Sequence, residues 1–330
     1  MVDLALSEQL AGTERIAAVR RFGRSDARFR NLTYGAALLV FLMFVGIIIS
    51  LAVGAWPAIK AFGPGFLITK IWNPVTQKFG ALGPIYGTVV TSALAMLVAV
   101  PVGIGIAIFL TEICPRPLRR PIGIAIELLA GIPSIIYGIW GLFVFVPFFQ
   151  RHIEPAIIDV FSGIPILQDL FAGPAYGSGV FAASLILSVM ILPFISAVTR
   201  DVFETVPSVL KESAYALGST TWEVMSYVVL PFSRGGVVGA SMLALGRALG
   251  ETMAVTFVIG NAHYIHESLF SLGTTISATI ANEFTEADSP LYYSSLIAIG
   301  LVLFAITFIV LASAQLMLRR LERRAGGRTL

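Results

Sequence analysis

Two residues of opposite charge, Arg247 and Glu251, stand four positions apart in a stretch that is otherwise mostly apolar or small, GRALGETMAV. Side chains at i and i+4 lie on one face of an α-helix, so the spacing predicts an ion pair. Gly246 and Gly250 flank the pair at the spacing that lets a second helix approach closely. Because a lone charge within a membrane span is costly, we expect the pair either to fix helix register or to lie on the path of a charged solute.

Glu127 is another charge within an apolar segment, ELLAGIPSIIYG. An acid in such a segment is expected to face protein or water rather than lipid. Pro133 predicts a break in the helix close by, because proline cannot donate a backbone hydrogen bond. Two roles stay open for Glu127: a carboxylate that pairs with a neighbouring helix or loop near the cytoplasmic end, or a member of a solute path.

Motifs for catalysis and for nucleotide binding are missing from the sequence. None of the four lysines follows a glycine, which excludes a Walker A loop, and neither G-x-S-x-G nor H-E-x-x-H occurs. The one cysteine, Cys114, excludes an intrachain disulfide, and His263 and His266 lack further metal ligands at a recognisable spacing. We therefore predict a non-catalytic chain that binds no metal or cofactor; if ATP drives it, another chain binds the ATP and Mg²⁺.

The composition requires elements that can bury their backbone in lipid. Of the 330 residues 57% are hydrophobic and 12% are charged. Runs of about 20 apolar residues span a bilayer as helices, because backbone groups in lipid must bond within their own segment. We predict an all-α membrane protein. Its six expected spans are 32–53, 85–110, 121–149, 178–199, 236–260 and 291–317.

The basic residues are divided unevenly between the two sides of the predicted bundle. With the N-terminus inside, the inside segments hold 17 Lys and Arg and the outside segments hold four. By the positive-inside rule this bias places both termini in the cytoplasm, and it explains the net charge of +3 without nucleic-acid binding. The chain then divides into a basic arm (1–31), expected to be disordered or to lie on a surface, a six-span domain (32–317) and a basic tail (318–330).

One inside loop, about 200–235, carries the signals of two short helices. Pro207 suits the first turn of a helix, and Gly218 suits a left-handed helix stop. Thr220 and Glu223 have the spacing of a capping box, which predicts the start of a second helix. Pro231 follows where that helix meets the next apolar segment. We expect a rigid knob outside the membrane that transmits force to a soluble partner.

This loop resembles the "EAA" loop of ABC-importer permeases, which in that family docks into a cleft of the ATP-hydrolysing subunit. Ser213 replaces the usual alanine and Val228 the usual isoleucine, and both departures are mild. The resemblance implies a six-helix type I importer permease with a cytoplasmic coupling helix. By the same resemblance the ATPase-coupling loop includes Glu212, Ala214, Gly218, Thr220, Glu223, Leu230 and Pro231.

The segments around Arg247 and Glu127 also resemble the membrane subunits of the bacterial high-affinity phosphate ABC importer. Residues 72–74 (WNP), residues 79–88 (FGALGPIYGT) and the basic arm are similar to its PstC-type subunit rather than to its PstA-type sister. The resemblance runs from about residue 30 to the end of the chain. It implies a multi-pass protein of the bacterial cytoplasmic membrane.

The same resemblance implies partners and a mechanism. The unit would contain a PstA-type second permease, two PstB-type ATPase subunits and a PstS-type extracytoplasmic phosphate-binding protein. That protein would deliver inorganic phosphate, ATP would close the ATPases, and the loop would move the spans by alternating access. In this mechanism Arg247 would screen the charge of the anion, and Glu251 would hold Arg247 in place.

Three other readings stay open from the residues alone. A permease for another oxyanion, sulfate or molybdate, would have the same features, since selectivity in such importers lies largely in the binding protein. An ion-coupled secondary transporter would use Glu127 and Glu251 as proton carriers, but it would leave the knob without a purpose. A receptor or assembly scaffold without a solute path would leave the charges of the fifth span unexplained.

Overall fold

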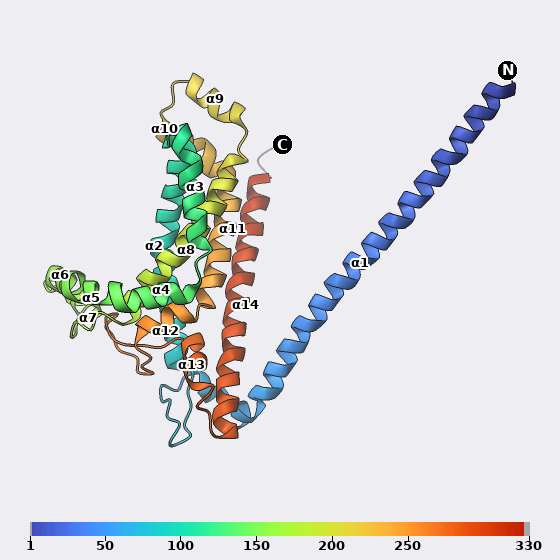
Figure 1. The fold of residues 1–330 in the computed structure, drawn as a ribbon. Coiled ribbons are helices and arrows are strands. Elements are labelled where there is room, and N and C mark those ends of the chain that lie inside the picture. The colour runs from blue at the N-terminus through green and yellow to red at the C-terminus, as the bar shows by residue number, and fades with distance from the viewer. Residues whose placement is uncertain (1, 327–330) are drawn as a thin grey trace. The chain divides into compact units, whose positions relative to one another are not determined.

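Helix α8 (Val180–Glu204) lies among the other helices of the bundle in the computed structural model (Figure 1). It packs against α2 (Leu82–Ile108) and α11 (Leu230–Leu249). Small residues let these helices approach closely. A Cβ atom on Gly103 of α2, for example, would lie 2.7 Å from Cγ2 of Ile195 on α8. The main apolar cluster of the molecule therefore surrounds α8.

The structure describes the backbone of residues 2–326 and the side chains of 26, 28–164 and 168–319. It contains two units, Met1–Gly54 and Ala55–Leu330, which are described separately. The first unit is formed by helix α1 (Val2–Phe62), which continues into the second. The described backbone of the arm, residues 2–31, is helical and continuous with the first span, and its placement on a surface stays a prediction. No proline interrupts this arm, and its Ala, Leu, Glu and Arg residues favour a helix.

Among the residues that the structure describes, six helical segments are long and apolar enough to cross a membrane. This confirms the predicted number of spans and their helical class. The β-type pairing in the same residues consists of two isolated bridges, Asn73–Lys78 and Gly260–Gly273. The six segments are Arg28–Leu67, Leu82–Ile113, Ser134–Phe161, Val180–Glu204, Thr221–Leu249 and Pro290–Arg319.

The predicted third span, 121–149, is divided in the structure. Helix α3 (Arg116–Ala130) ends before Pro133, and α4 (Ser134–Trp140) begins directly after it. Proline has no N–H to donate and keeps the preceding residue away from helical geometry, as the sequence led us to expect. The membrane segment is consequently Ser134–Phe161, and α3 is a separate helix that packs against α8.

The predicted fifth span, 236–260, is displaced towards the N-terminus of the chain. The second helix of the knob, α10 (Thr221–Val224), does not stand alone but continues through a π-helical turn (Met225–Val229) into α11. Helix α11 ends at Leu249, and Gly250 occupies its C-cap position. Glycine is a poor helix former, which explains a termination here.

The two ends of the bundle are formed by different segments of the chain. The loop end carries residues 205–220, and the far end carries residues 63–81 and 261–289; α9 and α13 mark these ends in Figure 1. A second apolar cluster lies at the far end and a third at the loop end. Further elements are a 3₁₀ turn (Gly63–Leu67), π turns (Phe109–Ile113, Gly141–Phe145, Phe149–Ile153), α5 (Val146–Phe148), α6 (Glu154–Phe161), α7 (Pro165–Leu170), α9 (Ser208–Ala216), α12 (Met253–Ile259), α13 (Ile276–Glu283) and α14 (Pro290–Gly326).

Candidate functional site

Two interrupted helices pack against each other inside the bundle. One interruption, residues 131–133, precedes α4, and the other, residues 250–252, precedes α12, which contacts α4. A Cβ atom on Gly138 of α4 would lie only 2.9 Å from the carbonyl oxygen of Met253, so the close approach requires a glycine. Helices broken within a membrane bundle are tolerated where they line a cavity or path rather than lipid. The region of the two breaks is therefore the candidate transport site.

Arg247 lies in the last turn of α11, directly before the second break, and its side chain is exposed. Its guanidinium is close enough to the Tyr137 hydroxyl on α4 for an electrostatic interaction. That hydroxyl donates a hydrogen bond of 2.9 Å to the carbonyl oxygen of Leu129, near the end of α3. Among the described residues, Arg247 takes part in none of the ion pairs. A cation with no acidic partner among the described side chains thus lies beside both breaks.

The predicted ion pair between Arg247 and Glu251 is not formed in the described part of the chain. Because α11 ends at Leu249, the two residues no longer share one helix face. Oε1 of Glu251 instead accepts a hydrogen bond of 3.1 Å from the backbone N–H of Ala254, in the first turn of α12. The first N–H groups of a helix have no partner inside it. Glu251 therefore stabilises the start of α12 and with it the shape of the break.

Glu127 lies on α3 near the loop end, and its partner is on another helix. Its Oε1 is 2.7 Å from a terminal guanidinium nitrogen of Arg200 on α8, which is also 2.9 Å from Oδ1 of Asp201. The pairing of Glu127 with a neighbouring helix, one of the two roles that the sequence left open, is thus formed. Whether Glu127 also contributes to a transport path stays a prediction, since no ion pair in the described structure joins it to Arg247.

The knob, residues 207–224, has the local geometry that its sequence predicts. Helix α9 begins directly after Pro207, and Gly218 adopts the left-handed conformation with φ of +86°. The capping box is complete: the backbone N–H of Thr220 donates to Oε2 of Glu223 at 2.7 Å, and the N–H of Glu223 donates to Oγ1 of Thr220 at 3.4 Å. A glycine elbow therefore joins two helices.

A largely buried ion pair attaches the knob to the bundle. Nζ of Lys211 on α9 is 2.6 Å from Oε1 of Glu112, in the π turn that follows α2, and these side chains are 19% and 10% exposed. Ala214 and Leu230 pack at the edge of the third apolar cluster, while Glu212 and Pro231 are exposed. The knob is thus held at its base.

The outer surface of the knob is apolar and open. Leu217 at the elbow is 88% exposed, and Trp222 on α10 is 70% exposed. Val209 and Tyr227 are also largely exposed on this part of the chain. Large exposed apolar side chains can contact lipid or another macromolecule. Leu217, which lies outside the candidate membrane spans, is a candidate for a docking contact.

At the far end, a buried polar network around Glu283 holds several segments of the chain together. Its Oε2 accepts hydrogen bonds of 2.6 Å from Nε1 of Trp72 and from the hydroxyl of Tyr292, and its Oε1 lies 2.6 Å from Nε2 of His263. The rings of Trp72 and His263 are stacked with centroids 5.3 Å apart. Burial alone raises the pKa of Glu283, but the hydrogen bonds from His263, Tyr292 and Trp72 outweigh it and leave the pKa lowered.

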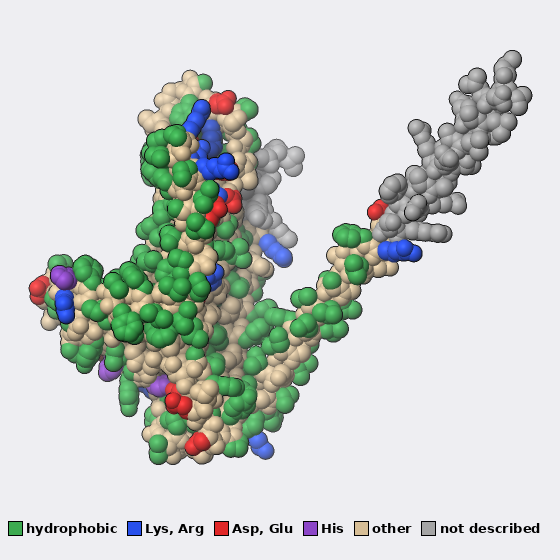
Figure 2. Space-filling model, viewed as in Figure 1, with side chains coloured by type: hydrophobic (Ala, Val, Ile, Leu, Met, Phe, Trp, Pro, Cys, Tyr) green, Lys and Arg blue, Asp and Glu red, His purple; other side chains and the backbone are tan. Residues whose placement is uncertain are grey.

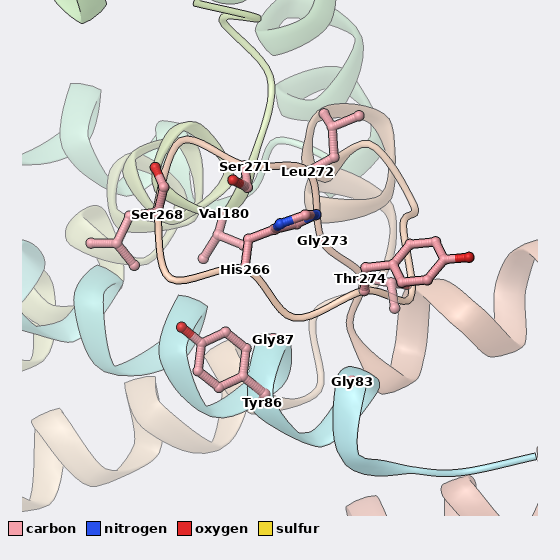
Figure 3. Close-up of a pocket in the computed structure, with 12 residues that line it drawn as sticks. Gly83, Tyr86, Gly87, Val180, His266, Ser268, Ser271, Leu272, Gly273 and Thr274 are labelled. Atoms are coloured by element: carbon pink, nitrogen blue, oxygen red, sulfur yellow. The ribbon is translucent and has the colours of Figure 1, made fainter. Parts of the chain in front are cut away.

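A small polar pocket lies beside this network, where the loop before α13 folds over the start of α2 (Figure 3). Tyr86, His266 and Thr274 contribute to its lining. A Cβ atom on Gly87 would overlap the carbonyl oxygen of Thr274, so loop and helix touch directly there. Its volume of about 10 Å³ is room for about one water molecule. The pocket is therefore a tight joint between two segments and not a solute site.

The sequence reasoning missed several partners that only the helix packing brings together. Arg200 was counted among the inside charges and not as the partner of Glu127, and Lys211 was not connected with Glu112. Tyr137 received no role. The available signal was weak: Glu112, Arg200 and Lys211 lie in predicted inside loops, but many other pairings are compatible with the same pattern.

Comparison with known proteins identifies a family and a fold. The family model for "Binding-protein-dependent transport system inner membrane component" matches residues 99–324. Two solved permease-containing transporters share the fold at low identity. The bacterial ABC transporter involved in the import of the acidic polysaccharide alginate aligns with a TM-score of 0.60 at 18% identity, over 90% of this chain and 98% of the other. An inward-facing MetNI methionine ABC transporter aligns with a TM-score of 0.50 at 17% identity, over 73% of this chain and 94% of the other.

Curated relatives match over most of their length. The phosphate transport system permease protein PstC of Mesorhizobium japonicum is 65% identical, over 95% of this chain and 96% of the relative. The protein of the same name from Pasteurella multocida is 56% identical, over 90% and 93%. The probable phosphate transport system permease protein PstC of Methanocaldococcus jannaschii is 37% identical, over 74% and 78%.

Proposed function

The chain belongs to the family of binding-protein-dependent transport system inner membrane components, and we propose that it is the PstC-type permease subunit of an ATP-driven importer of inorganic phosphate. The observation that carries the proposal is the 65% identity to a PstC protein along 95% of the chain. Such a subunit needs helices that span the membrane, a path between them and a surface for the ATPase. The six membrane helices, the two breaks and the exposed knob fit these three needs. As a permease it is a transport subunit rather than an enzyme.

The complete transporter that we propose has four kinds of subunit. This chain and a PstA-type permease form the path, two PstB-type ATPases bind ATP and Mg²⁺, and a PstS-type protein delivers phosphate from outside. The apolar knob docks on one ATPase through Trp222 and Leu217, which are largely exposed. Both termini and the loop end lie in the cytoplasm, in agreement with the distribution of Lys and Arg.

Arg247 and the two breaks carry the transport step in this proposal. An exposed guanidinium that has no acidic partner in the described part of the chain attracts a phosphate anion, and the broken helices around it line the path. Glu251 acts on the path indirectly, because it stabilises the start of α12. Glu127 and Arg200 lie nearer the loop end and contribute at the cytoplasmic mouth. Contacts with the anion stay weak, since transport requires release as well as binding.

Uptake measurements test the proposal directly. In proteoliposomes that contain the assembled transporter and enclosed ATP, uptake of labelled phosphate should depend on the binding protein and stop when the ATPase is inactivated. It should continue in the presence of a protonophore. Uptake that follows the proton gradient would instead support the secondary transporter in which Glu127 and Glu251 carry protons. Competition by sulfate or molybdate at equal concentration would identify another oxyanion as the substrate.

Substitution of Arg247 separates transport from assembly. Because Arg247 makes no ion pair with a described residue, Arg247→Gln should assemble normally and reduce uptake at least tenfold, while Arg247→Lys should keep partial activity through its charge. Glu251→Gln should be milder, since an amide oxygen can still accept from the Ala254 N–H. Near-normal uptake by an assembled Arg247→Gln variant would remove Arg247 from the path.

A further inference from the structure

A basic cavity of about 310 Å³ opens at the loop end, between α3 and α8. Glu127, Glu204 and Ile124 line it together with four arginines, and Figure 2 shows Lys and Arg side chains gathered at this end of the second unit. The four arginines are Arg116, Arg119, Arg120 and Arg200. Of the residues that line this cavity, only Glu127 and Arg200 have a role in the proposed transport path.

Two of the arginines are fixed in place by the protein. Arg200 is held by Glu127 and Asp201 at 2.7 and 2.9 Å, and a terminal nitrogen of Arg119 donates a hydrogen bond to the carbonyl oxygen of Thr111. The Nε atoms of Arg119 and Arg200 are nevertheless buried without a hydrogen-bond partner in the described structure. Nε of Arg200 faces Oε1 of Glu204 at 3.9 Å, which is too long for a hydrogen bond. Both guanidiniums are therefore fixed positive charges in the lining of the cavity.

The other two arginines are free to reach a ligand. Arg116 and Arg120 lie in the first two turns of α3, their side chains are exposed, and neither makes an ion pair or hydrogen bond with another described residue. The carboxylates at the cavity are directed to Arg200: Glu127 at 2.7 Å and Glu204 at 3.9 Å. The positive charge of Arg116 and Arg120 is therefore not neutralised by any residue that the structure describes, and the cavity attracts an anion.

We propose that this cavity binds a phosphate group, either the headgroup phosphate of an anionic phospholipid or a free phosphate anion at the cytoplasmic face. The planar guanidinium forks of Arg116 and Arg120 match phosphate oxygens, which accept several hydrogen bonds at once. A cavity of about 310 Å³ is large enough to admit a phosphate group together with water. The proposal does not depend on which solute the permease transports.

The apolar surroundings of the cavity are those of a headgroup site. Ile124 contributes to the lining and is 47% exposed, and Leu118 and Leu128 on the same helix are 50% and 69% exposed. An acyl chain can lie along such a helix while its phosphate meets the arginines. Basic pockets between membrane helices on the cytoplasmic side are where anionic headgroups bind. Free phosphate would use the arginines alone and would not need this apolar surface.

Binding measurements on the assembled permease and ATPase subunits in detergent, without the extracytoplasmic binding protein that itself binds phosphate, distinguish the two sources. The arms are dioleoylphosphatidylglycerol, dioleoylphosphatidylcholine and inorganic phosphate, each followed by native mass spectrometry and by the shift of the unfolding temperature. Loss of two guanidiniums in the variant Arg116→Gln/Arg120→Gln should weaken binding about tenfold or more. The same substitutions at Arg234 and Arg319, two exposed arginines at the loop end outside the cavity, serve as the matched control.

Each outcome has a defined meaning. Binding of phosphatidylglycerol that is lost in the cavity variant and kept in the control supports the site with a headgroup as its source. Binding of inorganic phosphate with the same pattern supports the site with the free anion as its source. The proposal is overturned if neither phosphate-bearing ligand binds, or if the cavity variant and the control weaken binding equally, which would reduce the effect to general surface charge.

Discussion

The knob at the loop end and the Glu283 network at the far end are built in opposite ways. The bonds that shape the knob join residues that are close in sequence, such as Thr220 and Glu223, three positions apart. Glu283 instead binds Trp72, 211 positions away, and also His263 and Tyr292 from two further segments. The knob is exposed, and the network is mostly buried.

The difference indicates what each end can do. A knob shaped by its own local bonds keeps its form when it moves, because those bonds move with it. The network joins the segments around Trp72, His263, Glu283 and Tyr292 into one piece, so its movement would break several strong hydrogen bonds at once. In the transport proposal the loop end transmits motion from an ATPase, and the far end remains a firm surface for the binding protein.

The largest effect should come from breaking the knob at its elbow. Gly218 has φ of +86°, which a β-branched residue adopts only at considerable cost, and open space surrounds it. Gly218→Val should therefore distort the elbow without crowding the bundle. We expect solute-stimulated ATP hydrolysis in the assembled transporter to fall at least tenfold, with little change in the unfolding temperature of the complex.

Gly163 provides the control for this substitution. It also has open space where a Cβ would lie, but it does not have a positive φ and it lies between α6 and α7. Gly163→Val should leave coupled hydrolysis near normal. Normal coupling in Gly218→Val as well would contradict the assignment of the knob as the coupling element.

A substitution at Glu283 tests the other side of the comparison. Glu283→Gln keeps the size of the side chain but weakens hydrogen bonds to a charged acceptor, so we expect the free energy of unfolding to fall by about 2 kcal/mol. Transport by the folded fraction should be little changed. The matched control is Glu267→Gln, an exposed acid in the same region, which should not alter stability. Equal stability of the two variants would show that the network does not hold the far end together.

The pH dependence of stability sharpens the same test. The pKa of Glu283 is lowered in the folded protein, so its contribution is complete above the ordinary pKa of glutamate, about 4.3, and is lost as the pH falls through the folded value. The unfolding temperature of the parent should therefore decrease from about pH 5 downward more steeply than that of Glu283→Gln. Parallel curves for the two proteins would contradict the lowered pKa.

The smallest effect should come from loosening the base of the knob. Lys211→Gln removes the ion pair with Glu112, but its amide N–H can still donate to that carboxylate, so the change should cost only about 1 kcal/mol locally. Amide hydrogen exchange in α9 should become several-fold faster, while exchange in α13 stays unchanged. Faster exchange in both helices would mean that the two ends are coupled, which the comparison does not predict.

The sequence by itself was enough for the features that depend on near neighbours or on the membrane. Six apolar runs became six membrane helices, because the bilayer requires length and hydrogen bonding within each segment. Gly218 and the Thr220–Glu223 capping box were predictable because a turn and a helix start involve only a few consecutive residues. The break at Pro133 was predictable as well, because it depends only on the proline and the residue before it.

Only the tertiary structure decided which charges meet. The i, i+4 spacing of Arg247 and Glu251 predicted an ion pair, but the spacing has this meaning only on an uninterrupted helix, and α11 ends between them. The partners of Glu127, Glu112 and Glu283 come from helices or loops that no local pattern connects with them. Side chains distant in sequence are brought together by how helices pack, and that packing depends on the close fit of small residues such as Gly103 and Gly138 against particular neighbours.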